Sequence, residues 1–424
     1  MKSMVKSKYS TDFRFSILDF RFPISLLLLG LILLLFQPVI IQAAEVDLKP
    51  GDTIGPNNWQ KIQDMVGPNF LERVKRGYTF QIKESKKFKP PREYGEATEK
   101  YSGGVRLASN GYLENYVLGL PFAKPDPNDP QAGEKLAWNF YWRWLGDNYK
   151  TGGATKTGQI IRYAIEKNGD ERRSDLVTYT IFPHTRYMLD PKPVLPGYEH
   201  IDWMQLRVVG YPRDSAGVST FGIRYTDPDK ADDLYIYIPA IRRIRRGTTT
   251  QRCQTLAPSE FNLDDINSFN AKVTNFNYKF LGEKKVLTNF TEEGLPFRRK
   301  KGDYLPLDEK WEVQDVYVLE ITPKDPSYCY PRKVLWIDKT TWESTWTLIW
   351  DKKGDLWKEQ FAFRTPVKLP DGREVWSVAT VVIVNVQNGR STVLTAVRAH
   401  NKDYPTSLWS LATMQRMMRG GSVE

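Results

Sequence analysis

The chain has 424 residues, 41% of them hydrophobic and 13% aromatic, which is enough to bury a sizeable core. Its 61 basic and 50 acidic residues give a formal net charge of +11, which suits contact with anionic envelope surfaces or simply maintains solubility. Only two cysteines and three histidines are present, none at ligand spacing, which excludes the usual zinc sites. Because no Gly-rich phosphate loop occurs either, we expect neither a metal nor a cofactor.

The first 44 residues combine a basic start, a largely apolar run from Ile24 to Phe36, and a small-residue exit at Ala43–Ala44. This order is typical of a secretory signal peptide, and Pro38 after the run favours removal near Ala43–Ala44. The alternative is an uncleaved membrane anchor, because about 20 apolar residues can span a bilayer. In both cases we expect export to the periplasm, which excludes nucleic acid and cytosolic nucleotide cofactors as partners.

Residues 45–155 carry helix and loop patterns. Asn58 is a candidate cap for a helix reaching Val66, and a second short helix is expected from Phe70 to about Gly77. Residues 83–100 are charged and contain two prolines, so we expect an extended or loop conformation. Pro130 and Gly146 bracket one aromatic-rich helix.

From residue 156 onward the pattern is mostly that of strands, because β-branched and aromatic residues recur in short runs between turns. The Asn388–Gly389 pair predicts a hairpin. Many short strands joined by turns indicate an antiparallel sheet that curls or closes. Residues 407–419 are expected to be helical, and this Met-rich helix either covers one open end of the sheet or acts as a lid or membrane-contacting segment.

The two cysteines, Cys253 and Cys329, have two interpretations. In an oxidising compartment they can pair, closing a long loop. Equally, each can be a buried apolar residue. Pairing is favoured slightly.

The most distinctive local pattern is an apolar strand running into four arginines between Tyr235 and Gly247. If one strand covers this segment, alternate residues face opposite sides. One face would then carry Tyr235, Tyr237, Ile241, Arg243 and Arg245, and the other would carry Arg246 among its members.

Guanidinium groups bind phosphate and carboxylate bidentately, so the arginines can form a headgroup clamp at the mouth of an apolar cavity. The alternative is pairing with local acids such as Asp264 and Asp265. We predict Arg243, Arg245 and Arg246, with Tyr235 and Tyr237, as ligand-binding residues.

Tryptophan is concentrated near the C-terminus, with six of the thirteen between positions 336 and 376. On a strand, Trp346, Leu348 and Trp350 share one face, and we predict that they line a lipid cavity. The same aromatics can stack on sugars or simply form the core.

The chain also resembles a known group of proteins. Residues 235–246, 251–252 and 259–265 are similar to a motif of exported bacterial proteins of the outer-membrane lipoprotein-sorting type. Residues 332–343 resemble the strand–turn–strand pair of that group, and residues 115–122 with 129–133 point to a long, uncharacterised branch of it.

This resemblance implies an α+β, β-dominated fold in which a strongly curved antiparallel sheet forms a half-open β-barrel with covering helices. We divide the chain into a signal peptide (1–44), an N-terminal helical and loop extension packed on the barrel (45–155), and the half-open barrel with its C-terminal helix (156–424). The length is about twice that of a minimal lipoprotein carrier, which leaves the nature of the cargo open.

The leading hypothesis is a non-enzymatic periplasmic carrier or chaperone that holds the acyl chains of a lipid or acylated ligand in an apolar barrel cavity. It would contact membrane surfaces and would work beside an inner-membrane exporter or an outer-membrane protein. The alternatives are a glycan- or cell-wall-binding module with an exposed Trp face, and an envelope hydrolase with acids assembled from distant strands.

Overall fold

The computed structural model describes residues 47–152, 160–247, 253, 255, 259–291, 298–402 and 404–418. The predicted signal peptide lies outside these residues, as does the Gln251–Arg252 part of the family motif. Among the described residues no helix is both long enough and apolar enough to cross a membrane.

Four α-helices are described: α2 (Pro68–Lys75), α3 (Arg92–Tyr101), α4 (Ala132–Tyr141) and α5 (Leu411–Met418). The strands before residue 250 are β1 (Thr53–Ile54), β2 (Phe80–Ile82), β3 (Arg106–Leu107), β4 (Leu113–Glu114), β5 (Asn148–Gly152), β6 (Ile160–Ile165), β7 (Glu171–Ile181), β8 (Ile201–Tyr211), β9 (Ser219–Tyr225), β10 (Asp233–Ile238) and β11 (Arg243–Arg246). The later strands are β12 (Phe276–Phe290), β13 (Lys310–Pro323), β14 (Arg332–Asp338), β15 (Ser344–Trp350), β16 (Leu356–Lys368), β17 (Glu374–Asn385), β18 (Ser391–Thr395) and β19 (Val397–His400).

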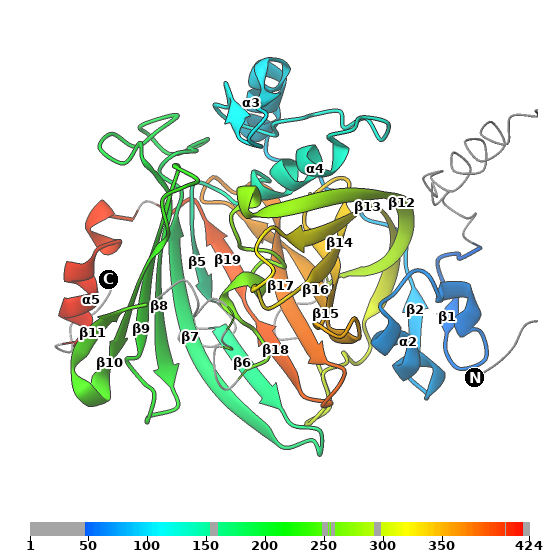
Figure 1. The fold of residues 1–424 in the computed structure, drawn as a ribbon. Coiled ribbons are helices and arrows are strands. Elements are labelled where there is room, and N and C mark those ends of the chain that lie inside the picture. The colour runs from blue at the N-terminus through cyan, green and yellow to red at the C-terminus, as the bar shows by residue number, and fades with distance from the viewer. Residues whose placement is uncertain are drawn as a thin grey trace, which may run out of the picture. The chain divides into compact units, whose positions relative to one another are not determined.

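All strands except β3 and β4 belong to one strongly curved sheet (Figure 1). Its antiparallel order runs from β11 through β10, β9, β8 and β7 to β6 and β5, then through β18 and β19 to β17 and back along the chain to β12. The end of β12 meets β16 in parallel, so strands β12 to β16 roll into a closed turn of sheet. Within the described residues β11 pairs only with β10, so the other end stays open. The predicted β-dominated, half-open architecture is confirmed.

Helices cover both faces of the rolled part. Alternate residues of β14 belong to two different clusters, with Val334 and Trp336 in one and Leu335 and Ile337 in the other. The first cluster includes Phe70 of α2, and the second includes Phe140 of α4. Because side chains alternate between the two faces of a strand, this sheet is buried on both faces. Helix α2 covers one face, and α4 with α3 covers the other.

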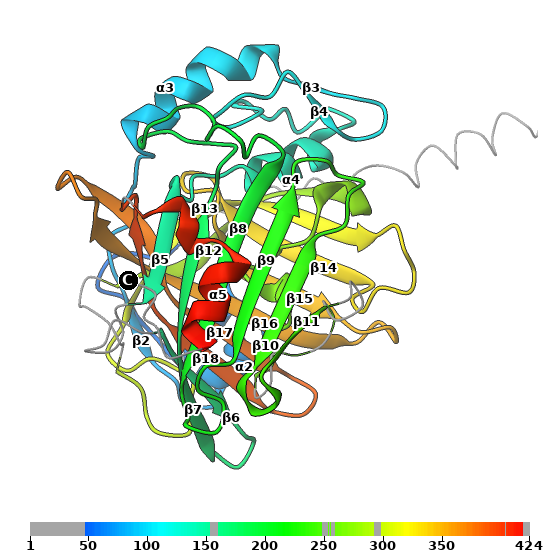
Figure 2. The same ribbon diagram turned by 90° about the vertical axis from the view of Figure 1, so that its left-hand side faces the viewer.

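The open part of the sheet, formed by β7 to β11, is covered on one face by α5 (Figure 2). Met414 of α5 packs with Tyr179, Leu206 and Phe221 of successive strands. The C-terminal helix therefore packs on a face of the open part and not, as predicted, over an open end of the sheet.

Several predicted elements form as expected, including α2 and α4, but two do not. The helix predicted from Asn58 is only a 3₁₀ turn at Trp59–Ile62, because the Asn58 side chain accepts from the Gly55 N–H instead of capping a longer helix. The loop predicted over 83–100 contains α3, which begins directly after Pro91. A proline just before the first turn starts a helix rather than breaking it.

The hairpin around Asn388 and Gly389 connects β17 and β18 as predicted. Its turn is longer than two residues, because the Asn385 N–H donates to Arg390 O and the Gly389 N–H donates to Asn385 O. Only Gly389 adopts positive φ, at 76°.

The proposed boundary at residue 155 stays a prediction. Three strands that precede it belong to the main sheet, since β1 pairs with β2, β2 pairs with β13, and β5 pairs with β7 and β19.

A buried carboxylate joins α2 to the sheet and predicts a pH dependence. Glu359 of β16 is fully buried and accepts from the backbone N–H groups of Asn69 (2.7 Å) and Phe70 (2.9 Å). Burial raises the pKa of Glu359 to about 7 despite these bonds. Because the pKa of Glu359 is higher in the folded than in the unfolded protein, its protonated form stabilises the fold, and this contribution is complete below about pH 4.5. The contribution is lost as the pH rises through 7. We expect about 3 kcal/mol less stability from this residue at pH 8 than at pH 4.5.

The measurement is urea unfolding at several pH values for the wild type and for Glu359→Gln, with the exposed Glu84→Gln as control. The Gln variant should flatten the pH dependence between 4.5 and 7, and the control should not. Parallel profiles for the wild type and Glu359→Gln would show that folding does not raise the pKa of Glu359.

Candidate functional site

The side of the open sheet opposite α5 carries a chain of cavities. The main cavity has a volume of about 110 Å³ and lies between β5 to β8 and β17 to β19. Two neighbouring cavities, of about 60 and 50 Å³, share Gln205 and Ile266 with it. All three are roofed by residues of the segment 259–270, which we call the roof segment.

Successive side chains of a strand point to opposite faces of the sheet, and this explains which residues meet at the main cavity. Gln205 and Arg207 of β8 point to the cavity side, while Met204 and Leu206 point to α5. In the register of the sheet Arg207 lies opposite Thr178 of β7, which also lines the cavity. The apolar part of the wall comes mainly from Leu176, Val381, Leu394 and Phe261.

Three arginines line this apolar cavity, namely Arg162, Arg207 and Arg398, and no Asp or Glu is among its described lining residues. Arg162 donates from Nε to the Ser174 hydroxyl at 2.8 Å. Arg398 is neutralised by Glu343, with Nη1 and the carboxylate 3.3 Å apart, and also donates to Asn267 of the roof segment.

Arg207 is the least compensated of the three cations. Its Nη2 donates to Gln205 Oε1 at a long 3.3 Å, and its buried Nε has no hydrogen-bond partner within the described part of the chain. Burial, together with the nearby positive charge of Arg162, lowers the pKa of Arg207 to about 10. A half-buried guanidinium with a buried, unused donor is costly unless an anion pairs with it.

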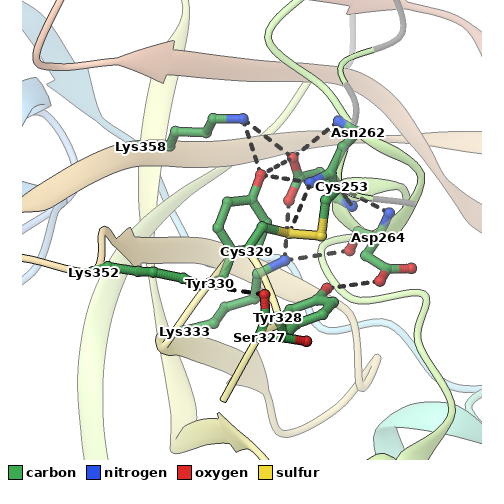
Figure 3. The surroundings of a disulfide bond; sticks show 11 residues. Cys253, Asn262, Asp264, Ser327, Tyr328, Cys329, Tyr330, Lys333, Lys352 and Lys358 are labelled. Carbon is green, nitrogen blue, oxygen red and sulfur yellow. Dashed lines mark hydrogen bonds and ion pairs between the residues drawn. A yellow bond between two sulfur atoms is a disulfide. The ribbon is translucent and has the colours of Figure 1, made fainter. Parts of the chain in front are cut away.

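The roof segment is fixed by a buried ionic cluster. Asp265 is fully buried and lies 3.1 Å from Lys333 Nζ and 3.6 Å from Lys358 Nζ. The Tyr330 hydroxyl donates to Asp265 at 2.8 Å, and the Asn262 side chain caps the turn at Asp264 and Asp265. Figure 3 shows Lys333, Lys358 and Tyr330 converging beside the disulfide.

The predicted pairing of the two cysteines is present in the structure. Cys253 and Cys329 form a disulfide with a Cα–Cα distance of 5.8 Å (Figure 3). The bond links the chain just before the roof segment to the loop between β13 and β14, across 76 positions of sequence. It fixes the chain just before the segment that the ionic cluster holds.

The arginine run of 242–246 does not form one strand with residues 235–238. The chain turns at Pro239–Ile241, Arg242 takes a left-handed φ of 50°, and β11 folds back on β10. Residues paired across an antiparallel ladder share a face, so Arg246 lies with Tyr235, whereas Arg243 and Arg245 lie with Ile238 and Ile236. The expected side-by-side arrangement of Tyr235, Tyr237, Arg243 and Arg245 is therefore wrong.

The residues of this hairpin differ in their surroundings. Tyr235 and Tyr237 pack in the cluster beneath α5. Arg246 is 71% exposed and pairs with Asp233, and not with Asp264 or Asp265, which are buried in the roof segment. Arg243 and Arg245 are exposed. Their predicted role in headgroup binding stays a prediction.

The predicted aromatic wall lies in the rolled part of the sheet. Trp346 is 1% exposed, contacts Phe70, Trp311 and Phe361, and donates from Nε1 to Leu287 O. Leu348 belongs to the same buried cluster. Trp350 is half-buried under the guanidinium of Arg332. These contacts are those of a packed core, so the structure favours the core interpretation of this row.

The cavity arginines were not among the predicted site residues. Arg162 interrupts a strand that is otherwise apolar, and Arg207 interrupts the apolar stretch Leu206–Val209, so this pattern was visible in the sequence. A charged residue on an apolar strand indicates a buried partner or a ligand. The four-arginine run is denser in the sequence, and its density alone favoured it as the predicted site.

The family model described as "Protein of unknown function (DUF1329)" matches residues 53–415. No protein with a curated description matches the sequence.

Three solved structures are similar to this chain. A DUF1329 family protein from Desulfovibrio piger is 19% identical, with a TM-score of 0.49, over 68% of this chain and 100% of its own. A Vibrio parahaemolyticus domain, described as a "putative outer membrane lipoprotein-sorting protein domain", is 18% identical with the same TM-score and coverage. A LolA superfamily protein from Nitrosomonas europaea is 14% identical, with a TM-score of 0.38, over 63% of this chain and 92% of its own.

Proposed function

The chain belongs to the DUF1329 family, and we propose that it is a non-enzymatic carrier or chaperone for an anionic amphiphile. The ligand has an acyl chain or comparable apolar tail and a carboxylate or phosphate head. The observation that carries this proposal is the apolar cavity lined by Arg162, Arg207 and Arg398 without a described acidic residue. The rolled, tryptophan-rich part of the sheet serves as the rigid support of this site.

The two halves of such a ligand match the two kinds of wall. Leu176, Val381 and Leu394 remove the tail from water, which contributes about 0.8 kcal/mol for each buried methylene group. The head meets Arg207, whose Nε is a buried donor without a partner in the described residues. Charge-assisted hydrogen bonds to a carboxylate or phosphate are about twice as strong as neutral ones.

The cavity volume limits the tail that fits without rearrangement. About 110 Å³ is smaller than the roughly 300–1,000 Å³ of pockets for drug-sized ligands. A short tail fits beneath the roof segment as it stands, and a longer tail extends by displacing Phe261 and Ile266 from the cavities that they line.

The site of action that we propose is the periplasm, on the basis of the export pattern in residues 1–44. An exporter of the inner membrane or a protein of the outer membrane is the expected exchange partner. Of the exposed arginines, Arg243 and Arg245 are candidates for contact with an anionic membrane surface.

The alternative of a glycan platform built from the tryptophans between 336 and 376 has less support. Trp336, Trp342, Trp346 and Trp376 are buried, so they offer no flat exposed row for stacking.

The experiment is native mass spectrometry of the exported protein purified without detergent, followed by organic extraction. A stoichiometric anionic amphiphile would support the proposal and identify the cargo class. A ligand-free protein that also takes up no fatty acid from vesicles would contradict it.

A further inference from the structure

A second cleft lies at the end of the open sheet nearest α4. It has a volume of about 210 Å³. It is bounded by α4, the start of β8, the end of β9 and the hairpin of β3 and β4. Figure 2 shows α4 and the β3–β4 hairpin at this end of β8 and β9. The Tyr112 hydroxyl donates to Asp229 at 2.6 Å, which links the hairpin to the turn after β9.

The walls of this cleft are mainly aromatic. Tyr116, Trp138, Tyr141, Trp142 and Tyr225 all line it. Tyr116 and Trp142 stack with their ring centroids 4.7 Å apart, and Tyr141 meets Trp142 edge-on. Such an arrangement holds the rings rigidly, so their remaining surface is a preformed site for a flat or ring-shaped ligand.

Polar atoms without partners point to a ligand here. The Arg224 side chain is 1% exposed, and its Nε and Nη2 bind Asp232 and Asn270 O, but its buried Nη1 has no partner in the described part of the chain. The same holds for the buried Trp142 Nε1 and His184 Nδ1. All three residues line this one cleft, and a buried polar group without a partner destabilises the empty protein.

The charges at the cleft are balanced. Arg224 is neutralised by Asp232, from which its Nη2 lies 2.8 Å away. Lys272 is held by the backbone carbonyls of Asp227 and Pro228 and lies 4.0 Å from Asp232, and the buried carboxyl of Asp202 accepts from the Tyr141 hydroxyl. A cleft with balanced charge and both donors and acceptors suits a ligand that is itself neutral and rich in hydroxyl groups.

We propose that this cleft binds a neutral sugar unit, with its ring against the aromatic walls and its hydroxyl groups on Arg224, Trp142, His184 and Asp202. The volume supports one ring, because about 210 Å³ exceeds the roughly 150 Å³ that accepts benzene in an engineered protein cavity. The site shares no lining residue with the arginine cavity, although Tyr141, Trp142, Asp202 and Arg224 also line the cavity of about 60 Å³ that adjoins both. The protein would thus carry an amphiphile and contact a glycan at different places.

The test is saturation-transfer NMR of the exported full chain with glucose, galactose and N-acetylglucosamine, and with glucuronic acid and glucosamine as charged counterparts. We expect transfer to at least one neutral sugar, followed by calorimetry to measure its affinity. Trp142→Phe keeps an aromatic ring but removes the indole N–H donor and part of the ring surface, and it should weaken binding about three- to tenfold. Leu113→Trp, which fills the cleft from the β4 side, should abolish binding.

Trp144→Phe is the matched control. Its indole Nε1 is also buried without a described partner, but Trp144 contacts Trp376 and His400 and is not among the residues that line the cleft. Loss of affinity in Trp142→Phe and Leu113→Trp, with wild-type affinity in Trp144→Phe, supports the proposal. Absence of transfer from every neutral sugar, preference for a charged sugar, or unchanged affinity in both cleft variants would overturn it. These outcomes are independent of amphiphile binding, so they do not bear on the carrier function.

Discussion

Replacing Arg207 by methionine is expected to weaken the binding of an anionic amphiphile at least tenfold while leaving the empty protein more stable. In the empty cavity Arg207 has one long hydrogen bond to Gln205, a buried Nε without a described partner, and Arg162 as a cationic neighbour. Methionine of similar length fills the apolar space and removes an uncompensated charge, which we expect to stabilise the fold by about 1 kcal/mol.

Binding should change in the opposite direction. A hydrogen bond to a charged group contributes about 1.5–3 kcal/mol, which corresponds to roughly a ten- to 150-fold change in affinity. The opposite signs of the two effects distinguish a ligand-binding arginine from a structural one, because loss of a structural arginine lowers stability and binding together.

The measurement compares decanoate with decanol by calorimetry and follows unfolding in urea. Wild-type protein should prefer the carboxylate at least tenfold, and Arg207→Met should lose that preference. Arg213→Met, which removes an exposed charge from the turn between β8 and β9, is the control and should change neither property. Equal preference for the carboxylate in wild type and Arg207→Met would exclude Arg207 as the anion-binding residue, and Arg245→Met would then test the exposed β11 hairpin in its place.

Replacing Asp265 by asparagine is expected to lower the free energy of unfolding by about 3–5 kcal/mol. The change preserves shape but removes the carboxylate that lies between two buried ammonium groups, those of Lys333 and Lys358. Both lysines are at least 96% buried, and burial already lowers the pKa of Lys358. Breaking a buried ion pair from one side leaves an uncompensated charge, which is more costly than removing the whole pair.

Urea unfolding of Asp265→Asn against the exposed Asp355→Asn measures this effect. The control should stay within about 0.5 kcal/mol of wild type. Adding Lys358→Met to Asp265→Asn should recover part of the loss, because it removes one of the two stranded charges. A loss below about 1 kcal/mol in Asp265→Asn would mean that solvent reaches this cluster and that the roof segment is not fixed by it.

The fold could be predicted from the sequence because its main evidence is local. Strand composition between Leu176 and Val397 and the turn at Asn388–Gly389 indicate a long antiparallel sheet. The parallel contact that closes the roll, between Asn289 and Phe363, joins residues far apart in the chain and leaves no such pattern.

The site was harder to predict because it is made by pairing between strands. Arg162, Arg207 and Arg398 come from β6, β8 and β19, and only the curvature of the sheet brings them to one cavity. The run of arginines near residue 245 is conspicuous in sequence, but Pro239 and the left-handed Arg242 turn it into an exposed edge hairpin. The tryptophans between 336 and 376 are also conspicuous in the sequence, but their density does not distinguish a packed core from the wall of a cavity.

The most direct test of the carrier account is a crystal structure of the protein loaded with 10-bromodecanoate, with bromine located by anomalous diffraction. The account predicts a carboxylate within hydrogen-bonding distance of the Arg207 guanidinium and bromine among Leu176, Val381 and Leu394, with the roof segment shifted if the chain needs more room. Bromine bound only outside this cavity, or a carboxylate that contacts none of its three arginines, would contradict it.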